Sequence, residues 1–403
     1  MFYQLDMSNQ LSPLKRQNIV YFWLIKTIVL AGVSALIQVS HAETPKDVKW
    51  GGVWLRGSDS ERKKFYPVGD QFARRVGSNQ DLNIAEEYSN RLIKDLLNIS
   101  KPSGKRIVDR LQNTKYVATS SGQAFVLACA VNYEFFEKTQ EAGESVVYAE
   151  VGFEMLVCDF ATRKVIFSLP SRLQYKDLWQ GEKHINSQIR KIYEERLPKS
   201  LLDLAKKTWD GETSFQTVGF GKVDVWDGAK KAMPARFQER PEFYLSTLFA
   251  STFSKSVDIP VMPFLKGKEA VYTGLVTTTL EDSQNITNLK MTGAGKDVFF
   301  VLQEPNYVFD LIFPAYRDVR GDGDGVVDTS LHYAFAKVTL KGGAGGIIFD
   351  KKYEEGVRRA IGKGEKVRPL WLASWDATSK LFGKAAKDIG NSKDNHLSSC
   401  KLR

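Results

Sequence analysis

The sequence predicts an α/β (α+β) fold of two tandem, related sandwich domains, each with a mixed or antiparallel sheet flanked by helices. Strand-forming residues fill two long runs joined by a short polar turn, Val146–Phe160 and Lys164–Gln174, and Phe125–Phe136 predicts a third strand before them. A strand, a hairpin and a following helix recur, in divergent form, in the second half of the chain. This recurrence indicates a duplicated unit.

The first domain is predicted over residues 43–210. Apolar residues between Ile84 and Leu97 keep helical spacing, which predicts a helix that packs one face on the sheet. The same kind of spacing predicts a second helix over Asn186–Thr208, kinked or divided at Pro198 because proline removes a backbone donor. Residues 211–240 are rich in glycine and lack sustained periodicity, so we expect them to link the two domains.

The second domain is predicted over residues 241–390. Pro241 opens a predicted helix that reaches Ser256, and Pro369 precedes a closing helix over Leu370–Ile389, since proline suits a first helical turn. Between these helices the pattern predicts strands over Ile259–Phe264, Val271–Leu280, Val298–Leu302, Val308–Tyr316, Ser330–Lys341 and Gly346–Tyr353. The polar tail, 391–403, is predicted to be disordered.

Residues 1–42 have the pattern of a signal peptide. Basic residues frame the apolar run Ile19–Val39, which ends in Ser40-His41-Ala42, a small-x-small triplet of the kind that signal peptidase cuts. An uncleaved membrane anchor is the alternative, because the run is nearly long enough to span a bilayer. We expect cleavage, export to the periplasm or beyond, and no stable membrane span in the mature chain.

The chain is modestly basic, with 57 Lys and Arg residues against 47 Asp and Glu residues. The positive residues are spread along the sequence, which is typical of a mixed solvated surface. Weak attraction to an anionic envelope polymer or membrane surface is the alternative. Nucleic-acid binding is not expected, because no basic run is interleaved with aromatic residues.

Two cysteines fall on the first two strands of the opening motif. A hairpin near Gly143 brings Cys129 and Cys158 roughly opposite each other, so a disulfide between them is one expectation for an oxidising compartment. The other is that both are small buried thiols, because directly facing strand positions rarely satisfy disulfide geometry. The sequence leaves both alternatives open.

An acidic loop, DVRGDGDGVVD, is the candidate metal site. Aligning Gly325 with the obligatory glycine of an EF-hand-like loop makes calcium ligands of four carboxylates, those of Asp318, Asp322, Asp324 and Asp328. Arg320 and Leu331 occupy the first and twelfth positions, where strong acidic ligands are expected. The alternative to weak calcium binding is a hairpin loop, in which Asp-Gly pairs are common.

Enzymatic signatures are weak. No metal-ligand spacing and no Ser/His/Asp arrangement stands out, and His332 is predicted to lie on a strand surface. The glycine-rich run 342–346 joins two strands and is predicted to be a hairpin turn, without cofactor binding. We therefore expect no enzyme. A secreted hydrolase with a carboxylate site between the domains is the alternative.

The hairpin formed by Leu156–Asp159 and Lys164–Ser168 resembles the "L-v-D-x-x-T-G-x-v-v-w-s" hairpin of a family of bacterial envelope proteins. This family includes the curli secretion lipoprotein, outer-membrane activators of peptidoglycan synthases and the TolB N-terminal domain. Arg163 stands where the family has a turn glycine, and the lipidation cysteine is absent. The resemblance implies a periplasmic interaction or assembly module and transfers no active-site residues.

Together these features predict an exported bacterial envelope protein that acts as a non-enzymatic binding or assembly module. Its expected partners are envelope proteins or an anionic envelope polymer, bound at sheet edges or at the Trp-rich segment Trp50–Trp54. A calcium-stabilised secreted structural protein is a further alternative.

Overall fold

A computed structural model describes most of residues 48–401. The segments outside the description within this range are 57–60, 62–63, 70–90, 93, 99–105, 113–124, 142–143, 160–161, 210–215, 265–268, 275–287, 294–295, 322–327, 362–370 and 393–396. The predicted leader, 1–42, lies outside the described residues. Asp47–Arg403 forms one compact unit. None of the described helices combines the length and the apolar character needed to cross a membrane.

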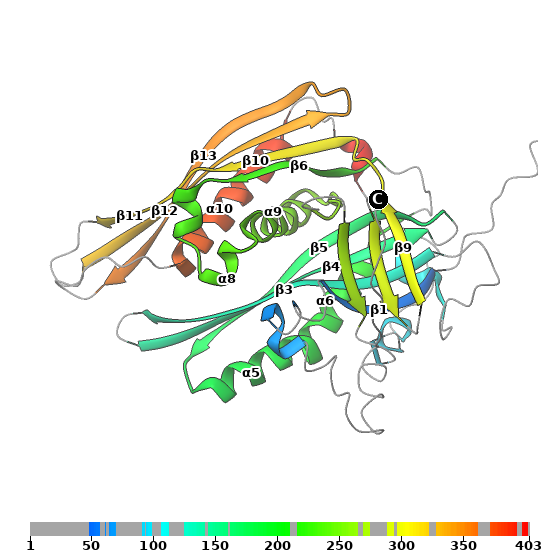
Figure 1. The fold of residues 1–403 in the computed structure, drawn as a ribbon, viewed down its shortest axis with the longest axis horizontal. Coiled ribbons are helices and arrows are strands. Elements are labelled where there is room, and N and C mark those ends of the chain that lie inside the picture. Colours follow the sequence, from blue (N-terminus) through cyan, green and yellow to red (C-terminus); the bar gives the residue numbers. More distant parts are fainter. Residues whose placement is uncertain are drawn as a thin grey trace, which may run out of the picture. The chain divides into compact units, whose positions relative to one another are not determined.

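The first sheet is built on the three long strands that the sequence predicts. β3 (Phe125–Glu141), β4 (Glu144–Asp159) and β5 (Lys164–Leu178) form an antiparallel meander, and β1 (Val48–Arg56) adds to β3 in parallel (Figure 1). Most of β4 is buried on both faces, which explains why its sequence alternates only partly. Trp50 is buried in β1 and Trp54 is partly buried, so the Trp-rich segment forms a strand whose tryptophans pack mainly inside the molecule.

Strands from the second half of the chain complete this sheet. β9 (Lys296–Leu302) pairs with β5, β8 (Asn288–Gly293) pairs with β9, and β7 (Glu269–Gly274) pairs with β8 and returns to Trp54–Arg56 of β1. The strands therefore close into a ring, with the two-residue β2 (Leu111–Gln112) beside β1. The ring joins segments that the sequence assigns to different domains.

The second sheet has five strands, β6 (Val218–Val225), β10 (Tyr307–Phe313), β11 (Tyr316–Gly321), β12 (Asp328–Gly342) and β13 (Ile347–Ile361). β12 is the central strand: β13 pairs along one edge, while β11 and β10 share the other. Gly345, with φ 79°, turns the β12–β13 hairpin, and this confirms the predicted glycine turn. The predicted strand Ile259–Phe264 is wrong, because its backbone makes only a bridge from Val261 to Val218.

The predicted linker, 211–240, is largely structured. It contains β6, α7 (Asp227–Lys231) and α8 (Ala235–Gln238), and β6 runs parallel to β10 within the second sheet. The sequence pattern did not predict β6, because the glycines of this strand interrupt the alternation of apolar and polar residues. The division of the chain into two domains stays a prediction.

Two helical layers cover the sheets. α5 (Glu182–Lys191), a π-helical turn (Ile192–Arg196) and α6 (Leu197–Ala205) pack on the first sheet, and Pro198 lies in the first turn of α6, as expected of a helix divided there. α9 (Pro241–Val257) and α10 (Trp371–Gly390) confirm the two other predicted helices. Their buried residues share a core with the second sheet and with Tyr133, Phe135 and Tyr148 of the first. The α+β sandwich class is thus observed.

The tail is not wholly disordered, contrary to the prediction for 391–403. Ser398–Cys400 forms a short 3-10 helix, and Leu397 and Cys400 are buried in the same core as α9 and α10. The two apolar side chains anchor a segment whose polar composition alone suggested disorder.

Candidate binding face and the polar clusters behind it

The second sheet has one covered and one uncovered face. Along β12, residues from Ala334 to Leu340 at alternate positions point into the core with α10, whereas Leu331, Tyr333 and Phe335 point the other way and are partly exposed. Among the described elements, no helix lies on this second side (Figure 1). We call it the outer face. It carries an apolar stripe where a fully solvated sheet face would carry polar side chains.

Neighbouring strands widen the stripe. Val319 of β11 is the cross-strand partner of Leu331, and Ile312 of β10 is that of Lys337, one position beyond Phe335 on the same face. The Tyr333 and Phe335 rings lie 6.4 Å apart between centroids. Paired side chains on one sheet face contact each other, so these residues form a continuous patch.

Gly356 of β13 makes room for the Tyr333 ring. A methyl group placed on Gly356 would lie 2.8 Å from Cε1 of Tyr333, closer than real contacts allow. The ring therefore lies close against the glycine backbone, in space that any other residue at position 356 would fill.

Cations border the apolar patch. Arg317 is the cross-strand partner of Tyr333 on one side, and Arg358 is that of Leu331 on the other, and both are exposed. In the described part of the chain, neither guanidinium forms an ion pair or a hydrogen bond. Further along the face, Lys337 pairs with Asp350 at 3.0 Å and Lys341 with Asp310. One acid also lies at this end: Glu354 is exposed and is the cross-strand partner of Phe335. With two arginines against one glutamate among the described residues, this end of the face has a net positive charge.

A tryptophan stands beside this end. Trp226 directly follows β6, its backbone N–H donates to the carbonyl of Phe313 at the end of β10, and its side chain is 54% exposed. Such a large apolar side chain is seldom so exposed. Burying it against a partner would contribute strongly to the free energy of binding.

On the opposite, inner face, the structure brings together a serine, a histidine and an aspartate. Ser330 Oγ lies 2.8 Å from Nε2 of His332, and Nδ1 of the same ring lies 2.6 Å from Oδ1 of Asp318. The prediction that His332 lies on a strand surface is wrong, because its side chain is 1% exposed. Both faces of β12 are partly apolar, so alternation alone could not tell which one His332 shares. The signal that was available is its two-residue spacing from Ser330.

This trio has the connectivity of a hydrolase triad, but it is enclosed. Ser330 is 2% exposed, and all three residues belong to paired strands, Asp318 on β11 and the other two on β12. A nucleophile must reach a substrate carbonyl as well as its base. The hydrogen bonds satisfy buried polar groups between two strands, and this is the role that their burial supports.

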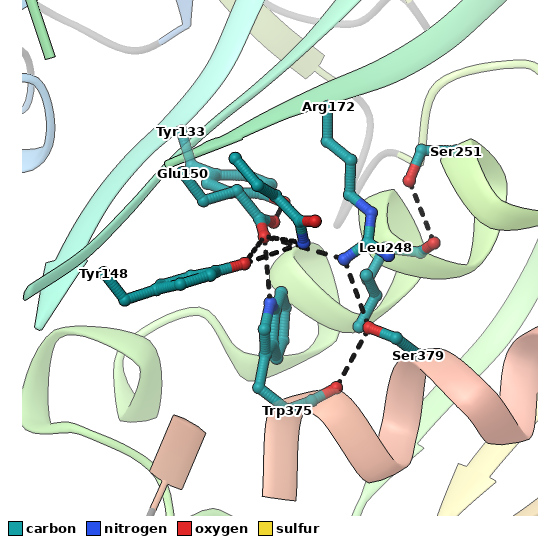
Figure 2. A network of polar contacts seen from close by, with 9 residues as sticks. Tyr133, Tyr148, Glu150, Arg172, Leu248, Ser251, Trp375 and Ser379 are labelled. Carbon is teal, nitrogen blue, oxygen red and sulfur yellow. Dashed lines mark hydrogen bonds and ion pairs between the residues drawn. The ribbon is translucent and has the colours of Figure 1, made fainter. Parts of the chain in front are cut away.

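A second buried polar cluster joins the first sheet to the helices. The Glu150 carboxylate of β4 accepts hydrogen bonds from Tyr133, from Tyr148, from Gln174 Nε2 at 2.7 Å and from Trp375 Nε1 at 3.3 Å (Figure 2). Arg172 lies 3.6 Å from the same carboxylate and donates to Ser379 of α10 at 3.1 Å. Glu150 is 0% exposed, so these partners compensate a charge removed from water.

The tyrosines in this cluster are donors. Burial raises the pKa of the Tyr133 and Tyr148 phenols, and the nearby charge of Glu150 raises it further. Both phenols therefore stay protonated and donate to the carboxylate at all physiological pH values.

Glu134 of β3 is another buried acid. Its carboxylate accepts from the backbone N–H groups of Val68 at 3.0 Å and Gly69 at 2.9 Å, and from the Tyr193 hydroxyl at 3.2 Å. Burial raises its pKa to about 7, although these donors oppose the rise. The sequence did not single out Glu134 or Glu150, because an acid within a strand carries no motif.

The candidate calcium loop is only partly described. Asp322 and Asp324 lie outside the described residues. Asp318 is bonded to His332 as stated, and Asp328 pairs with Arg320 of β11. Among the described residues, no three potential metal ligands lie together. The two sequence-based alternatives for this loop, a weak calcium site and a hairpin turn, both stand as predictions.

The disulfide considered for Cys129 and Cys158 is not formed: both thiols are free and buried. Their strands are paired, but Cys129 is the cross-strand partner of Met155, and Cys158 is that of Val126. The two cysteines are therefore three residues out of register. Cys129 packs in the core with α5 and α6, whereas Cys158 packs in a separate cluster on the other side of the sheet. Opposite faces keep the two sulfurs apart.

Comparison with known proteins gives no family. No family model matches the chain, and no curated protein matches it. Among solved structures, a homolog of the neuraminyllactose-binding hemagglutinin from Helicobacter pylori has a TM-score of 0.26 and 13% identity, over 46% of this chain and 87% of its own. A minor lipoprotein from Acinetobacter baumannii has a TM-score of 0.21 and 11% identity, over 40% of this chain and 92% of its own.

A hypothetical protein from Chlamydia trachomatis has a TM-score of 0.19 and 13% identity, over 39% of this chain and 96% of its own. All three are bacterial. At these TM-scores the likenesses assign neither a family nor a function to the chain.

Proposed function

We propose that this chain is an exported, non-enzymatic binding module of a bacterial envelope and that it holds a partner on the outer face. One observation carries the proposal: the outer side of β12 presents Leu331, Tyr333 and Phe335 between two exposed arginines, Arg317 and Arg358, that form no ion pair with any described residue. Aromatic residues and arginine are the types enriched where proteins bind other proteins.

Binding fits the molecule better than catalysis does. The only nucleophile–base–acid arrangement found among the described residues is enclosed, with Ser330 2% exposed. The outer face, by contrast, is open and rests on long, continuously paired strands. A rigid sheet needs little ordering when it binds, which favours affinity.

The experiment is photo-crosslinking in the bacterium of origin. A benzophenone amino acid replaces Phe335 in the full-length chain. In the matched control it replaces Lys199, an exposed residue of α6, the helix that packs on the first sheet. We expect a discrete adduct from position 335 and none from position 199. Equal labelling at the two positions, or none at either, would refute the proposal.

The export part of the proposal has its own measurement. Osmotic shock should release the protein without the leader. The mass of the released protein should match a chain that begins near Glu43, after the predicted cleavage site. A chain retained in the cytoplasm with its full mass would contradict export while leaving the binding face to be tested separately.

A further inference from the structure

We infer that the partner held on the outer face is a protein segment that combines acidic with apolar or aromatic side chains. This inference rests on the proposed function and deepens it by naming the chemistry of the occupant. Three features of the face carry it: an apolar patch, the charge left unbalanced around it, and the placement of the two arginines.

The apolar patch excludes a purely ionic occupant. Val319, Leu331, Tyr333 and Phe335 are each partly exposed, so every one of them has apolar surface left to bury. Burial of that surface contributes roughly 25 cal/mol per Å². A polymer that carries only anionic groups brings no apolar surface to the patch and gains none of this free energy. A protein segment with apolar side chains does gain it.

The charge balance disfavours a second copy of this chain packed face to face, because each copy would bring two arginines and one described glutamate, Glu354, to the contact. Lys337 and Lys341 are neutralised by Asp350 and Asp310, but Arg317 and Arg358 at the patch have no acidic partner among the described residues. A two-fold symmetric contact would place the same arginines around both patches. Like charges facing each other at an interface disfavour the pairing, and acidic groups favour it.

The two arginines stand on opposite sides of the stripe. Arg317 lies on β11 and Arg358 on β13, with β12 between them, so their backbones are about 10 Å apart across the sheet. A segment lying along β12 would cover Tyr333 and meet a guanidinium on either side. Paired hydrogen bonds from arginine to carboxylates then fix the segment in position.

The test uses defined probes rather than an unknown partner. Binding of fluorescent random glutamate–tyrosine copolymer, poly-glutamate and dextran sulfate is compared by anisotropy at about 0.15 M salt, where long-range attraction is screened. We expect the copolymer to bind at least about tenfold more tightly than the other two, a difference of about 1.4 kcal/mol. If dextran sulfate bound as tightly as the copolymer, the inference would be overturned, because the face would then recognise negative charge alone.

Two variants locate the binding. R317E with R358E should weaken copolymer binding about tenfold or more, whereas K183E with K191E, an identical charge change on α5, should leave it within about twofold. Y333S with F335S should remove the preference for copolymer over poly-glutamate. Equal losses in the two charge variants, or an unchanged preference in the aromatic variant, would overturn the inference. Circular dichroism confirms that each variant is folded.

The same variants separate this inference from the proposed function. If the adduct at position 335 persists in R317E with R358E, the face binds a partner but not through acidic groups, and the inference fails alone. If the wild-type chain gives no adduct at position 335, the proposed function itself fails.

Discussion

Trp375 of α10 donates its indole N–H to the Glu150 carboxylate of β4 at 3.3 Å, across 225 residues of sequence. The contact belongs to the cluster in which Tyr133, Tyr148, Gln174 and Arg172 surround the same buried acid (Figure 2). Because α10 also packs on β12 and β13, this cluster connects the first sheet to the helix that lies behind the outer face.

Replacing this acid should destabilise the whole unit. E150Q leaves Arg172 without its counter-charge in a buried site, and we expect a loss of about 3 kcal/mol of unfolding free energy. Urea denaturation followed by tryptophan fluorescence measures it. E144Q, an exposed change on the same strand, is the control and should stay within about 0.5 kcal/mol. A loss of similar size in both variants would contradict the role of the cluster.

The turn before β5 should be improvable. Arg163 has φ 55°, in the left-handed region, where the resembled family has glycine. Side chains other than glycine, asparagine or aspartate are strained there, so R163G should stabilise the protein by about 0.5–1 kcal/mol. Thermal unfolding checks this, with R163A as the control that should bring no gain. A lower melting temperature for R163G would show that the arginine side chain makes a compensating contact.

Stability should fall as the pH rises from about 5 to 8. Burial raises the pKa of Glu134 and of Glu137 from 4.5 to about 7, so the folded state binds more protons than the unfolded state within this window. Each group therefore favours folding below its folded pKa, and this advantage is lost as it ionises. Unfolding free energies from urea titrations at several pH values give the slope.

E134Q isolates the contribution of Glu134. The amide cannot ionise, so between pH 5 and pH 8 the variant should gain on the wild type by an amount on the order of 2–3 kcal/mol. Parallel pH profiles for the two proteins would show that Glu134 is already ionised in the folded state at pH 5.

The Ser330–His332–Asp318 trio should be structural. H332A removes the hydrogen-bond partner of Ser330, which is buried, and of Asp318, which is partly buried, and we expect a loss of about 2–3 kcal/mol of stability. A fluorophosphonate probe should not label the wild-type chain, since Ser330 is enclosed. Labelling of the wild type that disappears in S330A would instead reveal an acyl-transfer site and would count against a non-enzymatic module.

Millimolar calcium should not raise the melting temperature. Two of the four candidate ligands already have partners, Asp318 with His332 and Asp328 with Arg320, and calcium would have to displace them. Thermal unfolding with calcium and with chelator decides the matter. A rise that is abolished in D322A with D324A would establish the site.

Much of the fold could be predicted from local pattern. β3, β4, β5, α9 and α10 follow from dense strand formers or helical spacing, because each buries a continuous apolar surface. β6 was missed, since Gly219 and Gly221 break its alternation; added methyl groups there would meet Pro305 and Val308. Close packing between segments, not local propensity, makes this strand.

The candidate face was less predictable than the fold. Tyr333 and His332 are adjacent on a strand with both faces partly apolar, and only the position of α10 decides which side is core. Likewise, the partners of Glu150 come from β3, β4, β5 and α10, which are distant in sequence. The sequence predicts which strand or helix carries each of these residues. That they meet at one place in the structure depends on the tertiary arrangement.

The ring of strands in the first sheet bears on the order of folding. β1 and β5 gain their partners β7 and β9 only after residue 302 has been made, so the N-terminal half exposes two incomplete strand edges until then. Open edges pair readily with other extended chains. A fragment ending at the predicted boundary near residue 210 would keep those edges permanently, so we expect the first half to stay unfolded, or to be held by a chaperone, until the second half has been made.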